Sequence, residues 1–321
     1  MHYRRLGRSG LKVSEISLGA WITFGKQVDQ PAAANLIHAA YDQGINFFDN
    51  ADMYSGGQAE TLMGEAIKDL PREALVISSK VFWPTMPGPN GRGLSRKHVM
   101  ESIHASLRRL GTDYVDLYFC HRYDPDTPLE EVARVMDDLV HQGKVLYWGT
   151  SEWEASQIAQ VVGISRQFGL VPPSMEQPQY NMLHRRRFEE DIAPTCRELS
   201  MGITTFSPLY QGILTGKYNQ EIPTSSRASL EDMGWMRDRI TPERLGKVRA
   251  LTNVAQELKL TTGQLALAWI LRRKEISSVI TGATRLEQLD ENLAAAEAVD
   301  SLTNEVLERI EAILEPPHAG K

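Results

Sequence analysis

The sequence has little cysteine and no long apolar run. Its 321 residues include only two cysteines, Cys120 and Cys196, which lie far apart and form no CxxC pair, so neither a disulfide framework nor a structural zinc site is expected. The start, MHYRRLGRSGLKVSE, has no apolar signal core. No apolar run approaches the ~20 residues that a membrane helix needs. We therefore expect a soluble, cytoplasmic protein without membrane insertion.

The sequence also lacks long runs of one charge and several common motifs. The formal net charge is −6, from 35 Lys and Arg against 41 Asp and Glu, which argues against a nucleic-acid or anionic-membrane surface. No GxGxxG follows an expected strand, so a Rossmann site is not indicated. Residues 212–218 are one residue short of a Walker A loop and have Tyr where Ser or Thr is required. The eight histidines show no HExxH or paired ligand spacing, so no metal is expected.

What the chain does contain is a regular alternation of short apolar strands and helices. Hydrophobic residues make up 42% of it, enough to bury a sizeable core. The expected strands are 16–18, 45–48, 74–81, 115–120, 145–148, 174–177, 203–206 and 278–280. The expected helices are 31–43, 58–69, 96–110 (with Ser95 as its cap), 128–141, 154–168, 188–199, 242–258, 262–273 and 286–297.

Eight strand–helix units favour a (β/α)8 TIM barrel over the alternative, an open doubly wound sheet. A hairpin over 2–15 precedes the units and a helix over 303–314 follows them. Long loops are expected at 83–93 and 208–240. No stretch has the composition of a linker, so residues 1–321 are interpreted as a single barrel domain.

The stretch Gly44–Ala66, GINFFDNADMYSGGQAETLMGEA, contains the first candidate site residues. Asp49 ends an apolar strand and Tyr54 lies in the loop after it. Lys80 and His121 end the next two strands. Each residue alone has an ordinary explanation, as a cap, a packing group or a solvated charge. Together they come from three adjacent strands, whose ends form the active face of a barrel.

The chemistry of these four residues is coherent. A lysine ammonium lowers the pKa of a nearby tyrosine, and a carboxylate holds the lysine. A histidine can orient a substrate carbonyl. The set suits proton delivery to an oxygen while hydride arrives at the carbon, and the hydride must come from a cofactor. It does not suit acyl transfer, which needs an activated Ser or Cys beside a base.

Several motifs then show a family resemblance over almost the whole chain. They are LGRSGLKVSEISLGAW, GINFFDNADMYSGGQAE, DYVDLYFCHRYDPDTPLEE, GTSEW, EQPQYN, SPLYQGILTGKY, SSRASL and ATRLEQLDENL. With these motifs the chain resembles the aldo-keto reductases. Three of the motifs, EQPQYN, SPLYQGILTGKY and SSRASL, are similar to the branch that includes the β subunits of voltage-gated potassium channels and related microbial reductases.

The resemblance implies a role for each member of the tetrad Asp49, Tyr54, Lys80 and His121. Tyr54 would be the general acid in NADPH-dependent reduction of an aldehyde or ketone to an alcohol. Lys80 and Asp49 would tune it, and His121 would position the carbonyl. Channel β subunits often have asparagine at the histidine position, so His121 favours a working reductase. The aromatic substrate pocket would be formed by Trp21, Trp83 and Tyr123, with Tyr54.

The resemblance also implies an NADP(H) site. Ser151 and Gln177 would hold the nicotinamide carboxamide, and Phe206 would stack on the ring. The full set of expected cofactor residues is Trp21, Thr23, Asp49, Ser151, Gln177, Phe206, Ser207, Leu209, Gly212, Lys217, Arg227, Gly282, Thr284, Gln288, Glu291 and Asn292. Independently, glycines and basic residues after the seventh strand and the helix start after the eighth suit phosphate groups.

The chain departs from the family pattern at three places. Glu152 stands where many members have asparagine, which puts a negative charge near the carboxamide site. Gly282 and Ala283 replace a Lys-Ser pair that grips the 2′-phosphate, so Arg285 or Arg227 would have to substitute. Phe206 replaces a tyrosine or tryptophan but still permits stacking.

Two other functions remain open at this level. One is a nicotinamide-binding redox sensor that acts as a channel β subunit, with slow turnover. The other is a phosphate-sugar lyase or isomerase, which would keep the phosphate loops and need no hydride. The partner of the favoured enzyme is a small carbonyl compound, and the branch resemblance is compatible with a homo-oligomer, a tetramer or larger.

Overall fold

The computed structural model describes residues 1–224, 226–229 and 234–315, apart from the side chain of Arg227. These residues fall into two units, which we describe separately. The first comprises 1–178, 186–206 and 275–289, and the second comprises the described residues of 179–185, 207–274 and 290–315.

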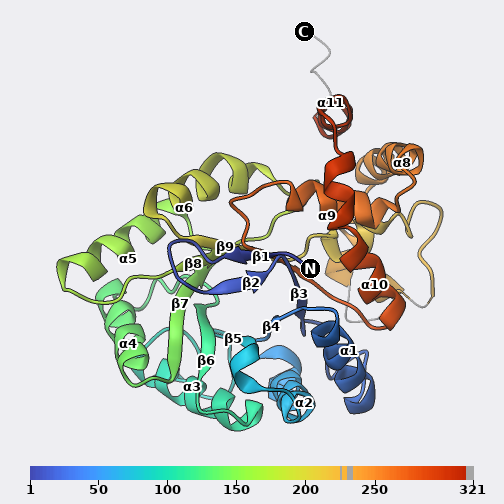
Figure 1. Cartoon of the computed structure of the whole chain (residues 1–321). Coiled ribbons are helices and arrows are strands. Elements are labelled where there is room, and N and C mark those ends of the chain that lie inside the picture. Colours follow the sequence, from blue (N-terminus) through green and yellow to red (C-terminus); the bar gives the residue numbers. More distant parts are fainter. Residues whose placement is uncertain (225, 230–233, 316–321) are drawn as a thin grey trace. The chain divides into compact units, whose positions relative to one another are not determined.

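The first unit contains a closed barrel of eight parallel strands (Figure 1). Around the barrel the order is β10, β3, β4, β5, β6, β7, β8, β9, so strands that are consecutive in the chain are neighbours and β10 closes the ring against β3. The strands are β3 (Ile16–Gly19), β4 (Phe47–Asp49), β5 (Val76–Val81), β6 (Val115–Cys120), β7 (Val145–Ser151), β8 (Met175–Gln177), β9 (Gly202–Thr205) and β10 (Ser278–Thr281). The predicted (β/α)8 barrel is confirmed, and the doubly wound sheet is excluded.

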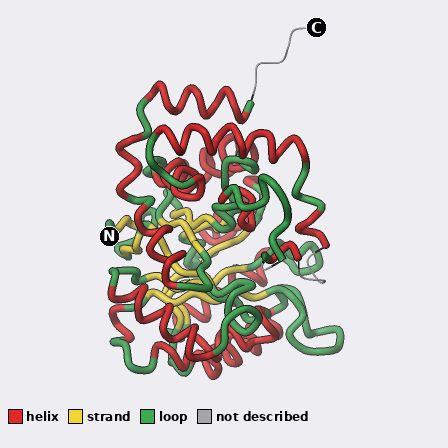
Figure 2. The backbone as a smooth tube through the Cα atoms, turned by 90° about the vertical axis from the view of Figure 1, so that its right-hand side faces the viewer, coloured by secondary structure: helices red, strands yellow, loops and turns green. Residues whose placement is uncertain are grey.

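Helices follow the strands and lie outside them (Figures 1 and 2). They are α1 (Gln30–Asp42), α2 (Gln58–Ile67), α3 (Arg96–Leu110), α4 (Leu129–His141), α5 (Ala155–Gln167), α6 (Ala193–Leu199) and α10 (Leu286–Ala294). Local signals set their ends: the Ser95 side chain accepts a hydrogen bond from His98 N and begins α3, and left-handed Gly111 ends it.

The helix predicted over 188–199 has two parts. Phe188–Ile192 forms a π-helical turn, η3, and α6 follows it. Pro194 has no N–H to donate and its ring crowds the preceding turn, which gives a physical reason for the wider turn at this point.

The predicted hairpin is also present, with β1 (Tyr3–Arg5) antiparallel to β2 (Lys12–Ser14). Its Leu6 and Val13 are fully buried and join the barrel core. The turn after β1 packs so closely on β9 that a Cβ at Gly7 would meet the Gly202 nitrogen at 2.3 Å, and the φ of Gly7 is +55°. Only glycine fits this position without a shift of the backbone.

The second unit is mainly helical. Its elements are η4 (Tyr210–Thr215), η5 (Arg227–Ser229), α7 (Gly234–Arg237), α8 (Pro242–Glu257), α9 (Thr262–Leu271), η7 (Glu297–Ser301) and α11 (Asn304–Leu314). Helix α8 packs against α9 and α11, and Tyr180 stacks on Trp269 with ring centroids 5.3 Å apart. The predicted long loop at 208–240 therefore contains short helical turns. None of the helices within the described ranges has the length and apolar character needed to span a membrane.

Candidate active site

Polar side chains occupy the carboxyl ends of the barrel strands. They lie on the same strand faces as the apolar residues that form the core earlier along each strand. Asp49, Lys80, His121 and Gln177 each continue such a face, because side chains two residues apart along a strand point the same way. The apolar residues on these faces are Phe47, Val76, Leu117, Phe119 and Met175, all of them in the barrel core. The strand pattern therefore brings the four polar groups to one rim.

Lys80 links the candidate catalytic residues. Its side chain is fully buried, and its ammonium makes three hydrogen bonds, at 2.6 Å to Asp49 Oδ2, 2.7 Å to the Asn50 carbonyl and 3.4 Å to the Tyr54 hydroxyl. These use all three donors of the group. Burial lowers the pKa of Lys80, and the charge of Asp49 opposes this. The lysine is thus held in one place by a carboxylate and directed at a phenol.

Asp49 is held from two further directions. Its Oδ1 accepts hydrogen bonds from the Ser78 hydroxyl at 2.8 Å and from Gln177 Nε2 at 3.0 Å. With Lys80 on Oδ2, the carboxylate has three donors, which is the arrangement that compensates a buried charge. Asp49 therefore acts as the fixed anchor of the site.

Tyr54 begins η1 (Tyr54–Gly57), a short turn that is separated from the end of β4 by residues 50–53. Left-handed backbone at Ser55 and Gly56 makes the turn tight, and the Ser55 hydroxyl bonds the Phe24 carbonyl at 2.9 Å. Only 9% of Tyr54 is exposed. We expected Lys80 to lower the pKa of this tyrosine. Instead, burial and the charge of Asp49 raise the pKa of Tyr54 well above its ordinary value, so the phenol keeps its proton.

His121 lies beside Tyr54, with ring centroids 5.9 Å apart in an edge-to-face arrangement. Its Nδ1 is buried and has no hydrogen-bond partner among the described residues. Burial, followed by the charges of Lys80 and Arg122, lowers the pKa of His121 well below its usual value. The ring is therefore neutral at pH 7 and can donate one hydrogen bond from one nitrogen.

Of the predicted pocket aromatics, Trp83 has a ring contact with the tetrad. Its ring centroid is 6.3 Å from that of His121 and 5.1 Å from that of Phe82. Tyr123 packs edge-on against Trp153 at 5.1 Å. Trp21 is partly buried in the turn after β3.

The predicted nicotinamide contacts of the first unit lie at the ends of β7, β8 and β9. Ser151 and Gln177 are register partners, and the Ser151 hydroxyl donates to the Gln177 carbonyl at 2.9 Å. The Gln177 side chain donates to Asp49, but its amide oxygen accepts no hydrogen bond from the described residues. Phe206 follows β9 and is partly buried. The hydroxyl of Thr23 is buried and bonds the Gly19 carbonyl at 3.2 Å.

The segment after β10 is held by a side chain. The Gln288 amide oxygen accepts from the Thr284 nitrogen at 2.8 Å and from its hydroxyl at 3.1 Å. Gly282, which precedes this turn in the sequence, is exposed. Arg285 is 70% exposed, and the Glu287 carboxylate lies 3.9 Å from it.

The predicted phosphate loop of the second unit has an unusual backbone. Ser207, Tyr210, Gln211 and Gly212 all have positive φ. A Cβ on Gly212 would meet the end of the Lys217 side chain at 2.9–3.0 Å. The absence of a side chain at Gly212 therefore leaves room for the lysine at this position. Turns with left-handed residues direct successive N–H groups to one side and form anion-binding concavities.

The remaining predicted contacts of the second unit have partners of their own or are buried. The Glu291 carboxylate accepts from the Thr261 hydroxyl at 2.6 Å, and Asn292 is 7% exposed. The Leu209 carbonyl accepts from the nitrogens of Gly212 and Leu214. The side chain of Arg227 lies outside the described residues.

Glu152, the departure beside the carboxamide position, is held by an arginine that the sequence did not single out. Arg187 Nη1 bonds the Glu152 carboxylate at 3.0 Å, and Nη2 bonds the carbonyls of Glu152 and Trp153 at 3.0 and 2.8 Å. Glu152 has a φ of +60°, so Arg187 fixes a strained turn directly after Ser151. The charge of Glu152 is thereby paired.

The buried or half-buried ionisable groups that lie outside the predicted set include Arg122, Glu176 and Asp52. Arg122 follows His121 at the end of β6, and its position in the sequence next to the histidine was the available signal. Glu176 and Asp52 are almost fully buried. Nothing in the sequence distinguishes Glu176, since its neighbour Gln177 points into the barrel and it points out. Among the described residues, Asp52 accepts no hydrogen bond from a helix N–H, and Gly57 is the residue that precedes α2.

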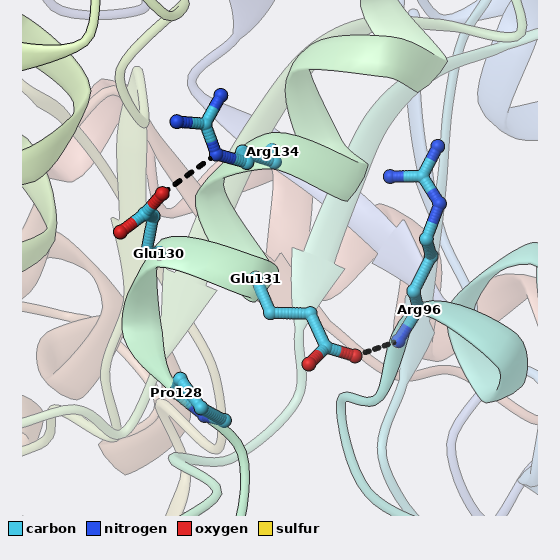
Figure 3. Close-up of a pocket in the computed structure, with 5 residues that line it drawn as sticks. All are labelled: Arg96, Pro128, Glu130, Glu131 and Arg134. Atoms are coloured by element: carbon cyan, nitrogen blue, oxygen red, sulfur yellow. Dashed lines mark hydrogen bonds and ion pairs between the residues drawn. The ribbon is translucent and has the colours of Figure 1, made fainter.

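A surface hollow of about 360 Å³ lies where α3 and α4 begin, and none of the predicted site residues lines it (Figure 3). It is lined by Arg96, Pro128, Glu130, Glu131 and Arg134. The acids in it are already paired, Glu130 with Arg134 at 2.8 Å and Glu131 with the Arg96 nitrogen at 2.8 Å. No group of three His, Cys, Asp or Glu side chains within the described residues is arranged to hold a metal.

Comparison with known proteins gives a consistent result. A model of the Aldo/keto reductase family matches residues 15–315. A probable voltage-gated potassium channel subunit beta from Arabidopsis thaliana is 47% identical over 319 residues, which covers 98% of this chain and 97% of that protein. The protein of the same description from Oryza sativa is 46% identical with the same coverage. A putative voltage-gated potassium channel subunit beta from Schizosaccharomyces pombe is 46% identical, with 97% and 93% covered.

Proposed function

Because the chain belongs to the aldo/keto reductase family, whose chemistry is oxidation and reduction, we propose that it reduces aldehydes or ketones to alcohols with NADPH. The observation that carries this proposal is the Lys80 ammonium, which bonds both the Asp49 carboxylate and the Tyr54 hydroxyl. We further propose that residues 1–321 act as one reductase domain.

In the proposed reaction each of the four tetrad side chains has a separate role. Tyr54 carries the proton that the carbonyl oxygen receives, and its raised pKa keeps that proton on the phenol until the oxygen becomes basic. Lys80 then stabilises the phenolate through its existing hydrogen bond. Neutral His121 donates a hydrogen bond that orients the carbonyl, and Asp49 keeps Lys80 in place. The bound nicotinamide supplies the hydride.

The rim residues fit a nicotinamide carboxamide. The free amide oxygen of Gln177 can accept from the carboxamide N–H₂, and Ser151 lies next to it in register. Phe206 offers an aromatic face at the end of the neighbouring strand. The Glu152 charge does not oppose this, because Arg187 neutralises it.

We propose NADP(H) rather than NAD(H) as the cofactor. The positive charges that support this choice are Arg285, which is largely exposed and only loosely associated with Glu287, and Lys217 beside the positive-φ turn of the second unit. Competitive titration with the two cofactors, followed by quenching of tryptophan fluorescence, measures the preference. Tighter binding of NAD+ than NADP+ would refute this part.

A second candidate function follows from the relatives, which are described as channel β subunits. On this alternative the chain binds the nicotinamide tightly, turns over slowly and associates with a membrane channel. His121 weighs against it, because the proposed carbonyl-orienting group is present.

The two functions are separated by a turnover assay with a matched variant. NADPH absorbance is followed with a panel of aromatic and short aldehydes, using the unaltered chain, Tyr54→Phe and Tyr147→Phe. Tyr54→Phe should abolish reduction and still bind NADP+, while Tyr147→Phe, which changes a tyrosine lower in the barrel, should stay active. Barely measurable turnover that Tyr54→Phe leaves unchanged would refute the reductase and favour the alternative.

A further inference from the structure

Arg122 is a cation at the rim of the barrel that the proposed reaction does not use. It directly follows His121 at the end of β6 and is partly buried. Its Nη1 donates to the His121 carbonyl at 2.5 Å, and its Cζ lies 5.7 Å from the centre of the Trp83 ring. No carboxylate within the described residues comes within 4 Å of the guanidinium.

This lack of an ion pair sets Arg122 apart from four other partly buried arginines of the same unit. Each of those has a carboxylate partner at 3.0 Å or less. The pairs are Arg4–Glu15, Arg72–Asp116, Arg109–Glu60 and Arg187–Glu152. Removing a charge from water is unfavourable unless it is paired, and burial indeed lowers the pKa of Arg122. The position therefore holds a positive charge whose counter-charge the described chain does not supply in direct contact.

Glu152 is the acid that influences Arg122 most, but it does not complete a pair with it. Its attraction raises the pKa of Arg122 against the effect of burial. Its carboxylate, however, is bonded to Arg187, which also holds the backbone of the same turn. The guanidinium nitrogens of Arg122 other than Nη1 make no hydrogen bond with the described residues.

The guanidinium also lies within electrostatic range of the proposed chemistry. Its positive charge contributes to the lowered pKa of Lys80 and of His121. At Tyr54 the same charge opposes burial and Asp49, which raise the pKa of that group. The Trp83 ring that it faces is itself 6.3 Å from the His121 ring. A substrate whose carbonyl is held by Tyr54 and His121 therefore has Arg122 nearby for a second, charged group.

We propose that Arg122 binds a carboxylate of the substrate, so that the preferred substrates are aldehydes or ketones that carry a carboxylate. This rests on the proposed reductase function. A guanidinium presents parallel N–H donors that match the two oxygens of a carboxylate. The site has one positive charge without a directly bonded carboxylate among the described residues, and the negative charge of Glu152 lies close by. A monoanion balances one positive charge, whereas Glu152 would repel the second charge of a phosphate dianion.

The carboxylate itself is unchanged in the reaction. The carbonyl carbon gains a hydride from reduced nicotinamide, which is oxidised, and the carbonyl oxygen gains the proton of Tyr54. The carbon–oxygen double bond becomes the single bond of an alcohol. Tyr54 recovers its proton from solvent.

The test compares 4-carboxybenzaldehyde with its methyl ester, which has the same ring and aldehyde but no charge. The unaltered enzyme should show a kcat/KM at least about tenfold higher for the acid, through a lower KM, as expected for one charge-assisted hydrogen-bonded pair. Arg122→Gln should remove this preference and Arg122→Lys should restore part of it. The control Arg134→Gln removes an exposed guanidinium of α4 and should leave the preference unchanged.

Equal losses for acid and ester in Arg122→Gln would overturn the inference, since they would mean that Arg122 only positions His121. So would an unaltered enzyme without preference for the acid. A phosphorylated aldehyde preferred over the carboxylate would overturn the choice of anion.

A separate measurement applies if no aldehyde is reduced at all. Benzoate and benzyl alcohol are titrated by calorimetry into the chain saturated with NADP+. Benzoate binding that is at least about tenfold weaker in Arg122→Gln supports the carboxylate site even though the reductase proposal has failed. Benzoate binding that Arg122→Gln leaves unchanged overturns the site.

Discussion

The Lys80 ammonium lies 2.6 Å from the Asp49 carboxylate, and both side chains are almost completely buried. Because the two charges are taken out of water together, neither is stable in the barrel without the other. This pair therefore determines both the stability of the rim and the direction in which the lysine points.

Removal of one member of this pair should destabilise the protein strongly. Asp49→Asn leaves an uncompensated ammonium among Tyr54 and apolar strands, and the free energy of unfolding should fall by about 3–5 kcal/mol. The double variant Asp49→Asn/Lys80→Met, which removes both charges, should be more stable than Asp49→Asn alone. Urea denaturation at pH 7 measures both values.

Glu101→Gln is the matched control for this prediction. It breaks the Lys97–Glu101 pair, in which both side chains are more than half exposed, and should change stability far less. A double variant that is less stable than Asp49→Asn would show that the lysine is tolerated unpaired, contrary to the prediction.

The pH dependence of carbonyl reduction should be flat across the neutral range. The pKa of Tyr54 is raised well above its ordinary value of ~10, and that of His121 is lowered well below ~6.5. Between about pH 6 and about pH 9, Tyr54 thus keeps its proton and His121 stays neutral, so neither changes state. The measurement is kcat against pH with a saturating aldehyde.

A fall of the rate centred near pH 7 would contradict this expectation if His121→Asn abolished it, since His121 would then titrate in the neutral range. A fall that persists in His121→Asn has another origin, such as cofactor binding. Comparison of the two profiles separates these cases.

The strand and helix positions could be predicted because local signals determine them. The apolar run Val115–Cys120 was predicted with the bounds that the structure shows, as was α3, whose Ser95 cap and following Gly111 are visible in the letters. Asp49, Lys80 and His121 were found because each is a polar residue at the end of an apolar strand. The carboxyl ends of β4, β5 and β6 are neighbours in the barrel, so these three residues lie close together in space.

The electrostatic state of the site could not be predicted in the same way. The pKa of Tyr54 depends on how completely its ring is buried, and the sequence carries no measure of that. Arg122 was overlooked because the feature that sets it apart, the lack of a contacting carboxylate among the described residues, is visible only in space. Arg187 lies 35 residues from the Glu152 carboxylate that it binds, so no local pattern reveals the contact.

Two buried acids, Asp52 before α2 and Glu60 within it, should respond to neutralisation to different degrees. Burial and the nearby Glu60 raise the pKa of Asp52 well above its ordinary value, which favours the neutral form of this acid in the folded chain. Glu60, by contrast, accepts hydrogen bonds from the Ser79 hydroxyl at 2.5 Å and from Arg109 at 2.7 Å. Asp52→Asn should therefore change the free energy of unfolding at pH 7 by no more than about 1 kcal/mol.

Glu60→Gln should lower the same quantity by about 3 kcal/mol, because it removes the carboxylate that pairs Arg109. Each variant serves as the control for the other, since both replace a buried acid by its amide. Urea denaturation of the two at pH 7 gives the comparison. A larger loss in Asp52→Asn than in Glu60→Gln would mean that Asp52 is the ionised member.

Glu176 should make stability fall as pH rises. Its carboxyl group is fully buried on the outer face of β8, and burial raises its pKa from 4.5 to about 8. The folded chain therefore keeps a proton that the unfolded chain releases above about pH 4.5. Stability that is fully present below that pH should be lost progressively up to about pH 8 and then level off. At most about 5 kcal/mol is involved for a shift of this size.

Glu176→Gln removes this titration and can still accept a hydrogen bond from Thr150, which donates to the glutamate in the native chain. The unfolding free energy of the variant, measured in urea from about pH 5 to about pH 8, should therefore decline less steeply than that of the unaltered chain. Glu198→Gln, at an exposed position of α6, should follow the unaltered chain. Identical slopes for all three proteins would mean that Glu176 is ionised inside the fold, and its buried charge would then need a partner that the described contacts around β8 do not provide.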